Sequence, residues 1–219
     1  MSEIGLLIFD CDGVLVDSEV VSVAVMKRVL ADVGWVLTSD EIIGRFVGGS
    51  KEHFDSQIEE ELGHSLPADW HRQYAPWYQE AFERELQAIP GIEHAIDALT
   101  VPYCVASNSN HTRIRRSLEL TGLFNRFDGR IFSAQDVRRP KPAPDLYLFT
   151  AECMGVSPAD CLVVEDSRYG VQAARAAGMT VLGYSGGLTP ESWLEEEGAT
   201  VFTSMDQLSE LIVATSGSS

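Results

Sequence analysis

The chain has 219 residues, 45% of them hydrophobic and 22% charged, a length that suits one large domain or a domain with a smaller insert. Its formal net charge of -17 argues against nucleic acid as a partner, because a polyanion would be repelled. No apolar run approaches the ~20 residues of a membrane-spanning helix and no signal-peptide pattern opens the chain, so we expect a cytoplasmic protein without a membrane partner.

Apolar runs at intervals along the chain predict the strands of one sheet. They are, in chain order, residues 4–9, 101–106, 130–133, 161–164, 180–184 and 200–203. Helical patterns, for example residues 112–121 and 167–177, lie between the later runs, and Gly178 closes the second of these patterns. Strands that alternate with helices in this way form a parallel sheet with helices on both faces. We therefore predict an α/β fold with a Rossmann-like core.

One segment interrupts this alternation directly after the first strand. It has helical patterns, such as residues 20–32 and 69–86, and no convincing strand. We predict a small helical domain, 18–87, inserted between the two parts of a core domain, 1–17 and 88–219. The two crossings between the domains would form a hinge, so the insert can act as a lid.

Polar residues stand where several of the predicted strands end. They are Asp10 and Asp12 after the first run, Ser107 and Asn108 after the second, and Glu165 and Asp166 after the run at 161–164. Between the last two pairs, Lys141 lies between Pro140 and Pro142, which stiffen the chain around one cation. Because ligand sites in such sheets lie at the carboxyl ends of the strands, we expect all of these side chains to meet at one edge.

The acidic residues Asp10, Glu165 and Asp166 would repel one another unless a hard cation lay among them. Mg²⁺ takes oxygen ligands, so the sequence predicts a magnesium site at this edge. The four cysteines have no Cys-x-x-Cys spacing, and neither a disulfide nor a zinc framework is expected.

A phosphate ester suits the other groups predicted at this edge. Lys141, the Ser107 hydroxyl and the Asn108 amide would offset the negative charge of a phosphate, together with the metal. Gly13 permits a sharp turn whose N–H groups face phosphate oxygens. A carboxylate that attacks phosphorus would form an aspartyl-phosphate, a known route of covalent catalysis.

The motifs DCDGVLVDS, ASN, KP and EDS, in this order and spacing, resemble those of the haloacid dehalogenase superfamily. The resemblance covers the whole core, and the helical insert is similar to the family's small cap domain. It implies that Asp10 is the nucleophile and that Asp12 is the general acid and base. The implied metal ligands are Asp10, the backbone carbonyl of Asp12, Asp166 and, directly or through water, Glu165. The residues implied to hold the transferring phosphoryl group are Ser107, Asn108 and Lys141.

The residue at position 12 indicates which reactions of the superfamily to expect. A carboxylate there favours phosphatases and mutases over dehalogenases, because an alkoxide leaving group needs a proton. Enzymes resembling β-phosphoglucomutase carry a cap histidine soon after the Asp-Ser pair, whereas this chain has VVSVA around Ser22. The stretches RFVGG, AIPGI and VPYCVASN are similar to bacterial sugar-phosphate phosphatases of the 6-phosphogluconate phosphatase kind.

The resemblance thus implies an enzyme, a Mg²⁺-dependent phosphatase acting on a small phosphorylated metabolite through an aspartyl-phosphate. A phosphosugar mutase is the alternative reaction. A non-enzymatic metabolite sensor is a third possibility, but sensing would not need Asp12. We expect a monomer.

Two cations of the insert, Arg45 and Lys51, flank a glycine-rich stretch in GRFVGGSKEHF. They indicate a specificity loop in which a cation meets a distal carboxylate or phosphate of the substrate. The alternative is a solvated turn before a helix that begins near Ser50. Structural roles also remain open elsewhere, since Ser107 and Asn108 suit an N-cap of the next helix.

Overall fold

The computed structural model describes residues 4–47 and 51–217, without the side chains of residues 51, 52 and 217. The chain divides into two compact units. The first, here called the core unit, comprises Met1–Asp17 and Gln87–Ser219, and the second, the helical unit, comprises Ser18–Leu86.

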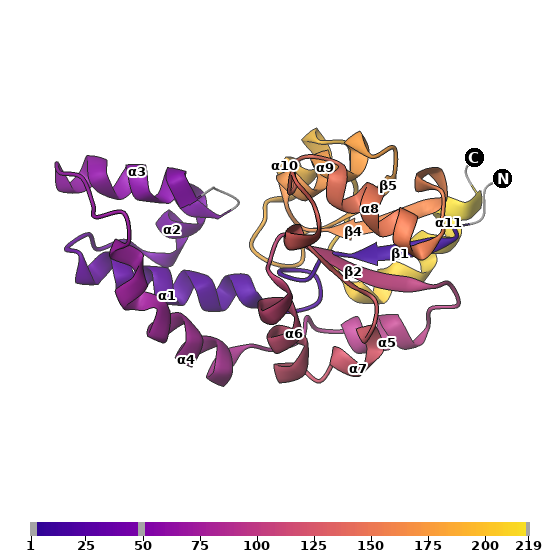
Figure 1. Cartoon of the computed structure of the whole chain (residues 1–219), viewed down its shortest axis with the longest axis horizontal. Coiled ribbons are helices and arrows are strands. Elements are labelled where there is room, and N and C mark those ends of the chain that lie inside the picture. The colour runs from indigo at the N-terminus through magenta and orange to yellow at the C-terminus, as the bar shows by residue number, and fades with distance from the viewer. Residues whose placement is uncertain (1–3, 48–50, 218–219) are drawn as a thin grey trace. The chain divides into compact units, whose positions relative to one another are not determined.

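Six strands among the described residues form one parallel sheet in the core unit (Figure 1). They are β1 Leu6–Phe9, β2 Tyr103–Ser107, β3 Ile131–Ser133, β4 Cys161–Glu165, β5 Thr180–Tyr184 and β6 Thr200–Phe202. Their order is β3-β2-β1-β4-β5-β6, and all neighbours pair in parallel. This is the strand order of a Rossmann sheet, so the predicted fold class is confirmed.

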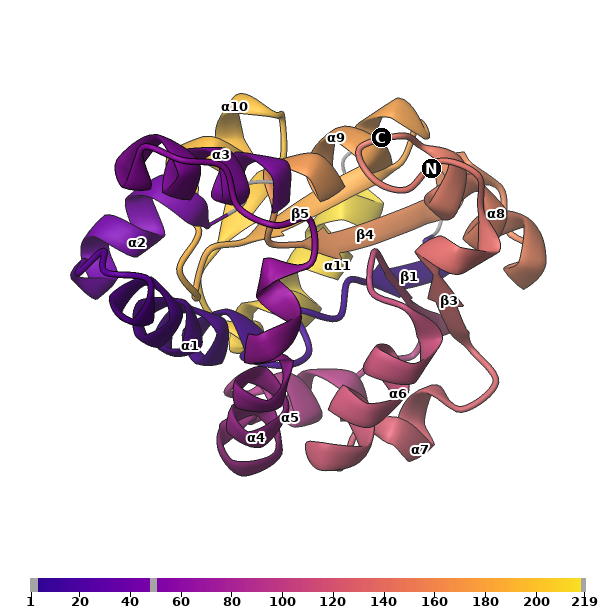
Figure 2. The ribbon, with the colours of Figure 1, turned by 60° about the vertical axis from the view of Figure 1, so that its left-hand side comes forward.

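Helices cover both faces of this sheet, as Figure 2 shows. On one face lie α8 Asp145–Met154, α9 Arg168–Ala176 and α10 Glu191–Glu196, and on the other α5 Ile92–Asp97, α6 His111–Leu120 and α7 Phe124–Phe127. The last helix is α11 Leu208–Gly217, and the single turns of 3-10 helix are η2 Ala134–Asp136, η3 Pro158–Asp160 and η4 Met205–Gln207. Such crossover helices are what parallel neighbours require.

The middle of the sheet is closely packed on both faces. All four residues of β1 are fully buried, as expected of a continuous apolar run in a central strand. Phe9 packs edge-on against Tyr103 and Phe127, with ring centroids 6.4 and 6.2 Å apart. Ile8 belongs to the apolar cluster that α8 and α9 complete on the opposite face. This packing holds the end of β1, where Asp10 follows, in a fixed position.

Five of the six predicted strands have at least one different end in the structure, and the differences in β2 and β4 bear on the site. β2 begins at Tyr103 rather than residue 101, since Pro102 lacks the N–H that a ladder needs. It extends to Ser107, and β4 extends to Glu165. Both polar residues therefore stand in the last position of a strand, where the sheet itself fixes their backbone.

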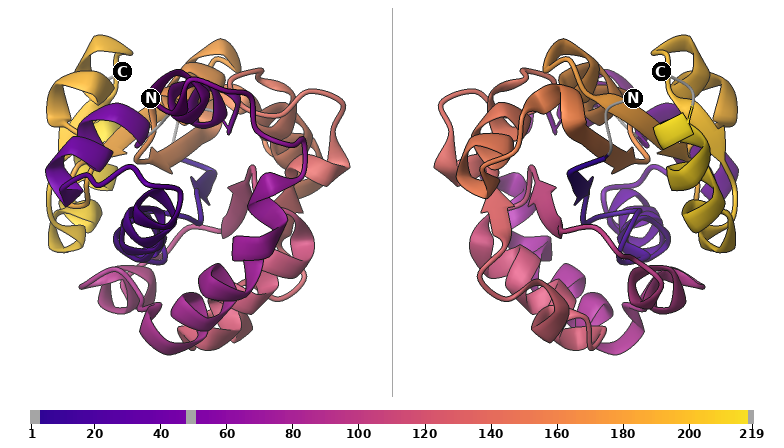
Figure 3. Two further views of the ribbon diagram at one scale, coloured as in Figure 1. Left: turned by 90° about the vertical axis from the view of Figure 1, so that its left-hand side faces the viewer. Right: turned by 90° about the vertical axis from the view of Figure 1, so that its right-hand side faces the viewer.

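The helical unit consists of α1 Ser18–Asp32, α2 Ser39–Phe46, α3 Lys51–Leu62, the 3-10 helix η1 Trp70–Tyr74 and α4 Ala75–Glu85. Its described residues contain no strand, and Figure 3 shows them, from indigo to purple, as helices and loops. The helical pattern predicted at 69–86 is present as two consecutive elements, η1 and α4: Pro76 lies in the first turn of α4, where no N–H is required, and marks the start of the second element.

The two chain crossings next to the helical unit pair with each other inside the core unit. Asp17 N donates to Gln87 O at 2.9 Å, and Ile89 N donates to Leu15 O at 3.0 Å. Val16 also forms an antiparallel bridge with Ala88. The crossings are therefore a short two-stranded connection rather than two independent loops.

Two exclusions drawn from the sequence also concern the fold. Every helix among the described residues is too short or too polar to span a lipid bilayer. The four cysteines, Cys11, Cys104, Cys153 and Cys161, are free thiols in the structure.

Candidate active site

The site forms where β1 ends, between β2 and β4. The strand order reverses at this point, because β2 and β3 lie on one side of β1 and β4 to β6 on the other. Asp10 N donates to Val164 O at 2.9 Å, which ties the first acid to β4. Gly13 then takes a positive φ of 77°, and its N–H donates to Val16 O at 2.9 Å. The sharp turn expected at Gly13 is present.

Lys141 joins the ends of three strands through its ammonium group. Nζ donates to Asp10 Oδ1 at 2.8 Å, to Glu165 Oε1 at 2.7 Å and to Ala106 O at 2.9 Å. These three acceptors match the three protons of an ammonium group. Its side chain is 3% exposed. Lys141 is therefore a buried, fully bonded cation rather than a surface lysine.

Burial and neighbouring charges have opposite effects on the pKa values of Asp10 and Lys141. Burial raises the pKa of Asp10 to about 7, although the ammonium of Lys141 favours the ionised form. Burial alone would lower the pKa of Lys141, but Asp10 and Glu165 outweigh it and raise that pKa well above its usual value. Lys141 thus stays charged, while Asp10 carries a net cost of desolvation that a bound cation would reduce.

Glu165 accepts five hydrogen bonds. Oε1 accepts from Lys141 Nζ and from the hydroxyl of Tyr147, at 2.7 and 2.9 Å. Oε2 accepts from Asp166 N at 3.1 Å, and from the N–H and hydroxyl of Ser167 at 3.0 and 2.9 Å. Burial, followed by the charge of Glu165, raises the pKa of Tyr147 well above its usual value, so Tyr147 stays a donor. The Glu165 carboxylate is therefore held in place by hydrogen bonds from within the protein, and this is the anchor role that we assign to it.

Two glycines make room for the acids that follow β4. A Cβ at Gly170 would lie 1.7 Å from Glu165 Oε1, so the Glu165 carboxylate occupies the space over the first turn of α9. A Cβ at Gly13 would lie 1.9 Å from Asp166 Oδ2. Asp166 therefore packs directly against the turn that carries Asp10 and Asp12.

The acids brought together here fit a magnesium ion. Asp10, Glu165 and Asp166 are all buried, and each offers a carboxylate oxygen within 4.8 Å of the others. An oxygen donor set of this kind suits Mg²⁺. Three carboxylates beside one ammonium also leave an excess of negative charge that a divalent ion would balance.

Ser107 and Asn108 lie at the end of β2, beside Lys141. Asn108 Nδ2 donates to Lys141 O at 3.1 Å, and Lys141 N donates to Asn108 Oδ1 at 3.0 Å. The Ser107 hydroxyl accepts from Ser109 N at 3.1 Å. Neither residue caps the next helix, because the N-cap of α6 is Asn110. The N-cap alternative is therefore wrong, and the Asn108 side chain orients the backbone of Lys141.

Asp12 lies on the more exposed side of the turn. Ser109 Oγ donates to Asp12 Oδ2 at 2.7 Å, and Arg113 Nη2 lies 3.4 Å from Oδ1. The side chain is 25% exposed, compared with 11% for Asp10. The two acids of the motif thus differ in environment: one is buried against a lysine, and the other is accessible.

Comparison with known proteins agrees with this geometry. Residues 4–178 match the sequence pattern of the family of haloacid dehalogenase-like hydrolases. The chain belongs to this family. It is 32% identical over 212 residues to the 6-phosphogluconate phosphatase of Escherichia coli K12, covering 96% of each chain.

Two solved structures extend the comparison. A haloacid dehalogenase-like protein of Agrobacterium tumefaciens has a TM-score of 0.89 at 38% identity, covering 96% of this chain and 98% of that one. A hydrolase of the same family from Deinococcus radiodurans, with bound phosphate and sodium, has a TM-score of 0.85 at 31% identity, covering 99% and 98%. The predicted family and enzyme class, a phosphatase, are confirmed.

The remaining predicted site residues of this haloacid dehalogenase-like hydrolase belong to the helical unit. Arg45 lies at the end of α2, with its guanidinium carbon 5.6 Å from the ring centroid of Trp35. Its carbonyl accepts from His53 Nε2 at 2.9 Å. Lys51 is the first residue of α3, but its side chain lies outside the described part of the structure, as does Ser50.

Sequence reasoning missed four residues of the site. They are Ser109, Arg113, Tyr147 and Ser167. Ser109 directly follows the Ser107-Asn108 pair and Ser167 directly follows the Glu165-Asp166 pair, and this adjacency was the available signal. In the sequence, Tyr147 resembles any other apolar residue on the buried face of α8. Its partner is separated from it by 18 positions, and nothing in the sequence pattern indicates that contact.

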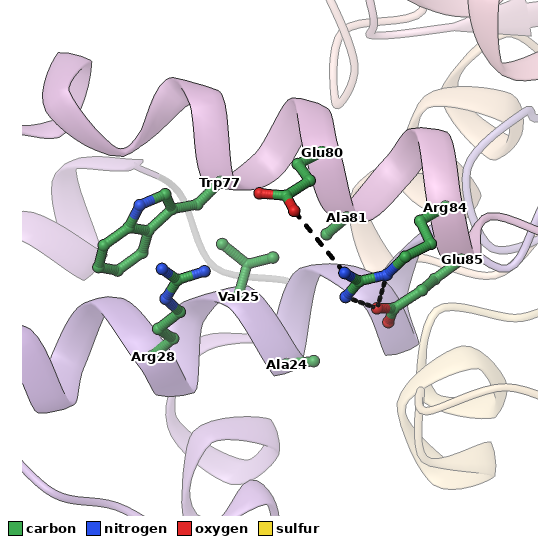
Figure 4. A pocket seen from close by; sticks show the side chains of 8 residues that line it. All are labelled: Ala24, Val25, Arg28, Trp77, Glu80, Ala81, Arg84 and Glu85. Carbon is green, nitrogen blue, oxygen red and sulfur yellow. Dashed lines mark hydrogen bonds and ion pairs between the residues drawn. The ribbon is translucent and has the colours of Figure 1, made fainter.

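The helical unit also contains a pocket of about 130 Å³ between α1 and α4 (Figure 4). The guanidinium carbon of Arg28 lies 3.7 Å from the ring centroid of Trp77. Arg84 pairs with Glu80 at 3.7 Å and with Glu85. Both cations of the pocket are thus engaged with neighbouring groups of the unit, and we assign no ligand to it.

Proposed function

We propose that the protein is a Mg²⁺-dependent phosphatase that hydrolyses a sugar phosphate or a phosphorylated sugar acid through an aspartyl-phosphate on Asp10. The observation that carries the proposal is the buried contact of Asp10 with Lys141, beside Glu165 and Asp166. The E. coli relative named 6-phosphogluconate phosphatase supports this substrate class, and the relative with bound phosphate supports a phosphoryl site.

The acids at the carboxyl edge would hold the metal. Asp10, Asp166 and the backbone carbonyl of Asp12 are the proposed ligands. Since Glu165 already accepts five hydrogen bonds, we assign it to anchoring Lys141 and to contact with Mg²⁺ through water. When bound, Mg²⁺ would supply positive charge opposite the phosphate oxygens.

The first half of the reaction transfers the phosphoryl group to the enzyme. A carboxylate oxygen of Asp10 attacks phosphorus, and Lys141 keeps that carboxylate oriented and offsets phosphate charge. The Ser107 hydroxyl and the Asn108 region hold the phosphoryl group. The carboxyl group of Asp12 gives its proton to the leaving oxygen.

The second half regenerates the enzyme. A water molecule attacks the phosphorus of the aspartyl-phosphate, and Asp12 accepts its proton. The helical unit acts as a lid on the paired crossings near Val16 and Ala88 and excludes bulk water from the first step. Arg45 and Lys51 are its proposed specificity residues, meeting a distal carboxylate or phosphate of the substrate.

The test is a panel of phosphorylated sugars and sugar acids, assayed for phosphate release with and without Mg²⁺. We expect release from some members with the wild-type enzyme, and none with Asp10→Asn. A phosphosugar mutase would instead give isomerised hexose phosphate through a bisphosphate, with little free phosphate. Absence of both products from the whole panel would reject an enzyme of either kind.

The proposal includes a monomer in the cytoplasm that acts on a small molecule. Sedimentation of the purified protein and fractionation of cells would test these two points. A stable dimer, or recovery outside the cytoplasm, would contradict them.

A further inference from the structure

The carboxylate of Asp12 is held by residues that lie far from it in the sequence. The Ser109 hydroxyl donates to one carboxylate oxygen at 2.7 Å, and the Arg113 guanidinium lies 3.4 Å from the other. Donors on two different oxygens fix the plane of a carboxylate as well as its position. This group of contacts is therefore able to set the direction in which Asp12 presents its proton.

Both donors are themselves anchored. Ser109 O accepts from the hydroxyl of Ser133, a fully buried residue at the end of β3, at 2.7 Å. Ser109 N donates to Ser107 Oγ at 3.1 Å. Arg113 stands in the first turn of α6, where its N–H donates to the N-cap Asn110 at 2.9 Å. The backbone of the two donors is thus fixed by the sheet edge and by the start of α6.

We propose that Ser109 and Arg113 are positioning residues that hold the Asp12 carboxyl group in the orientation needed for proton transfer. The inference rests on the proposed function. In the first step the bond from Asp10 to phosphorus forms, the bond to the leaving oxygen breaks, and the Asp12 proton moves to that oxygen. In the second, water bonds to phosphorus, its proton moves to Asp12, and the bond from Asp10 to phosphorus breaks.

The importance of this positioning depends on the leaving group. A strongly basic oxygen departs with difficulty unless it receives a proton, whereas 4-nitrophenolate departs well without one. Phenyl phosphate and 4-nitrophenyl phosphate are nearly alike in size, so a change in binding affects both similarly. The ratio of their kcat/KM values therefore reports proton donation by Asp12 in the first step.

The experiment compares Ser109→Ala, Arg113→Ala and Arg113→Lys with the wild type, in the presence of Mg²⁺. In the two alanine variants, kcat/KM for phenyl phosphate should fall about tenfold or more relative to 4-nitrophenyl phosphate, because general acid catalysis contributes at least that much. Arg113→Lys should restore part of the ratio, since it keeps the charge. The matched control is Arg115→Ala on the same helix, whose guanidinium pairs with Glu119 at 2.8 Å, and it should leave the ratio unchanged.

Equal losses for both esters would overturn the inference, because they would assign Arg113 or Ser109 to substrate binding or to structure. Wild-type ratios in both alanine variants would overturn it as well. If Ser109→Ala does not fold, Arg113→Ala decides the matter, since the Arg113 side chain is 49% exposed. A wild-type enzyme that releases no phosphate from either ester would instead reject the proposed function, and the inference with it.

Discussion

Lys141 donates a hydrogen bond from its ammonium group to Asp10 Oδ1 across 2.8 Å, although 131 positions separate the two residues. The same nitrogen donates to Glu165. β1 and β4 pair side by side, and Lys141 belongs to the segment between β3 and α8. One buried cation therefore links the proposed nucleophile to the acidic end of β4, and we expect the stability of the fold to depend on the same groups as the proposed reaction.

Replacing the cation should affect stability and activity together. Lys141→Met keeps a similar length but leaves Asp10 and Glu165 without their counter-charge. Loss of one partner of a buried ion pair costs about 3–5 kcal/mol, and we expect the free energy of unfolding in metal-free buffer to fall by that order. Urea denaturation measures this, and phosphate release should also be lost.

A surface pair provides the control for this variant. Arg139 pairs with Asp145 at 2.7 Å, and its side chain is 68% exposed. Arg139→Met should cost less than about 1 kcal/mol, because exposed pairs contribute little. Similar unfolding curves for the two variants would contradict the structural role given to Lys141.

The anchor role of Glu165 predicts that its amide analogue will not replace it. All five hydrogen-bond partners of this carboxylate are donors, so either orientation of Glu165→Gln turns an NH₂ group toward donors. We expect a loss of about 2–4 kcal/mol in the free energy of unfolding. Tyr147→Phe removes a single donor and should cost about 1 kcal/mol. Chemical denaturation measures both losses. A loss for Tyr147→Phe that equals or exceeds the loss for Glu165→Gln would contradict the anchor role of Glu165.

Gly170 and Gly44 form a second matched pair. Both stand in helices, and alanine in place of glycine in a helix normally stabilises by about 1 kcal/mol. Gly44→Ala in α2 should show this gain, because, among the described residues, no atom beyond the chain neighbours and the backbone of the helix itself lies within 4 Å of the added Cβ. Gly170→Ala should instead destabilise by about 1–3 kcal/mol, because its Cβ must displace the carboxylate of Glu165. Thermal unfolding checks both, and a stabilised Gly170→Ala would show that Glu165 does not occupy this space.

The pKa of Asp10 predicts how the effect of Mg²⁺ changes with pH. Burial raises it to about 7 from an ordinary value of 3.8, so the folded chain binds this proton more tightly than the unfolded chain. The resulting stability is fully present below about pH 4 and is lost as the pH rises through about 7. A metal ion binds the ionised carboxylate and competes with the proton. We therefore expect Mg²⁺ to raise the melting temperature more at about pH 8 than at about pH 5.

Differential scanning fluorimetry at constant ionic strength measures this difference. Asp10→Asn cannot ionise at this position, so its response to Mg²⁺ should be weak at both pH values. A wild-type response that is equal at the two pH values, or larger in acid, would contradict the assignment of Asp10 as a metal ligand.

The sequence predicted the strands well because each is a buried apolar run bounded by turn residues. It also predicted that Asp10, Lys141 and Asp166 meet, since the carboxyl ends of parallel strands share one edge of a sheet. The start of β2 and the division between η1 and α4 were harder to predict from the sequence, because each depends on a single proline. The hydrophobic periodicity of a sequence does not show the effect of a single proline.

The partners of Asp12 illustrate what sequence patterns do not contain. Ser109 and Asp12 are separated by 97 positions, and Arg113 and Asp12 by 101. Arg113 lies among other arginines on a polar helix, and its identity as a site residue comes from the direction in which α6 leaves β2. The same applies to Asn108, whose side chain supports the backbone of Lys141 rather than standing free beside it.

The most direct test of the account is a search for a phosphoryl group on Asp10. Wild-type enzyme would be mixed with a turned-over substrate and Mg²⁺, quenched in acid within the first turnover, digested and analysed by mass spectrometry. The proposed mechanism predicts one phosphoryl group on the peptide that contains Asp10, and none in Asp10→Asn. Phosphate release by an enzyme whose Asp10 never carries phosphorus, or turnover by Asp10→Asn at the wild-type rate, would contradict it.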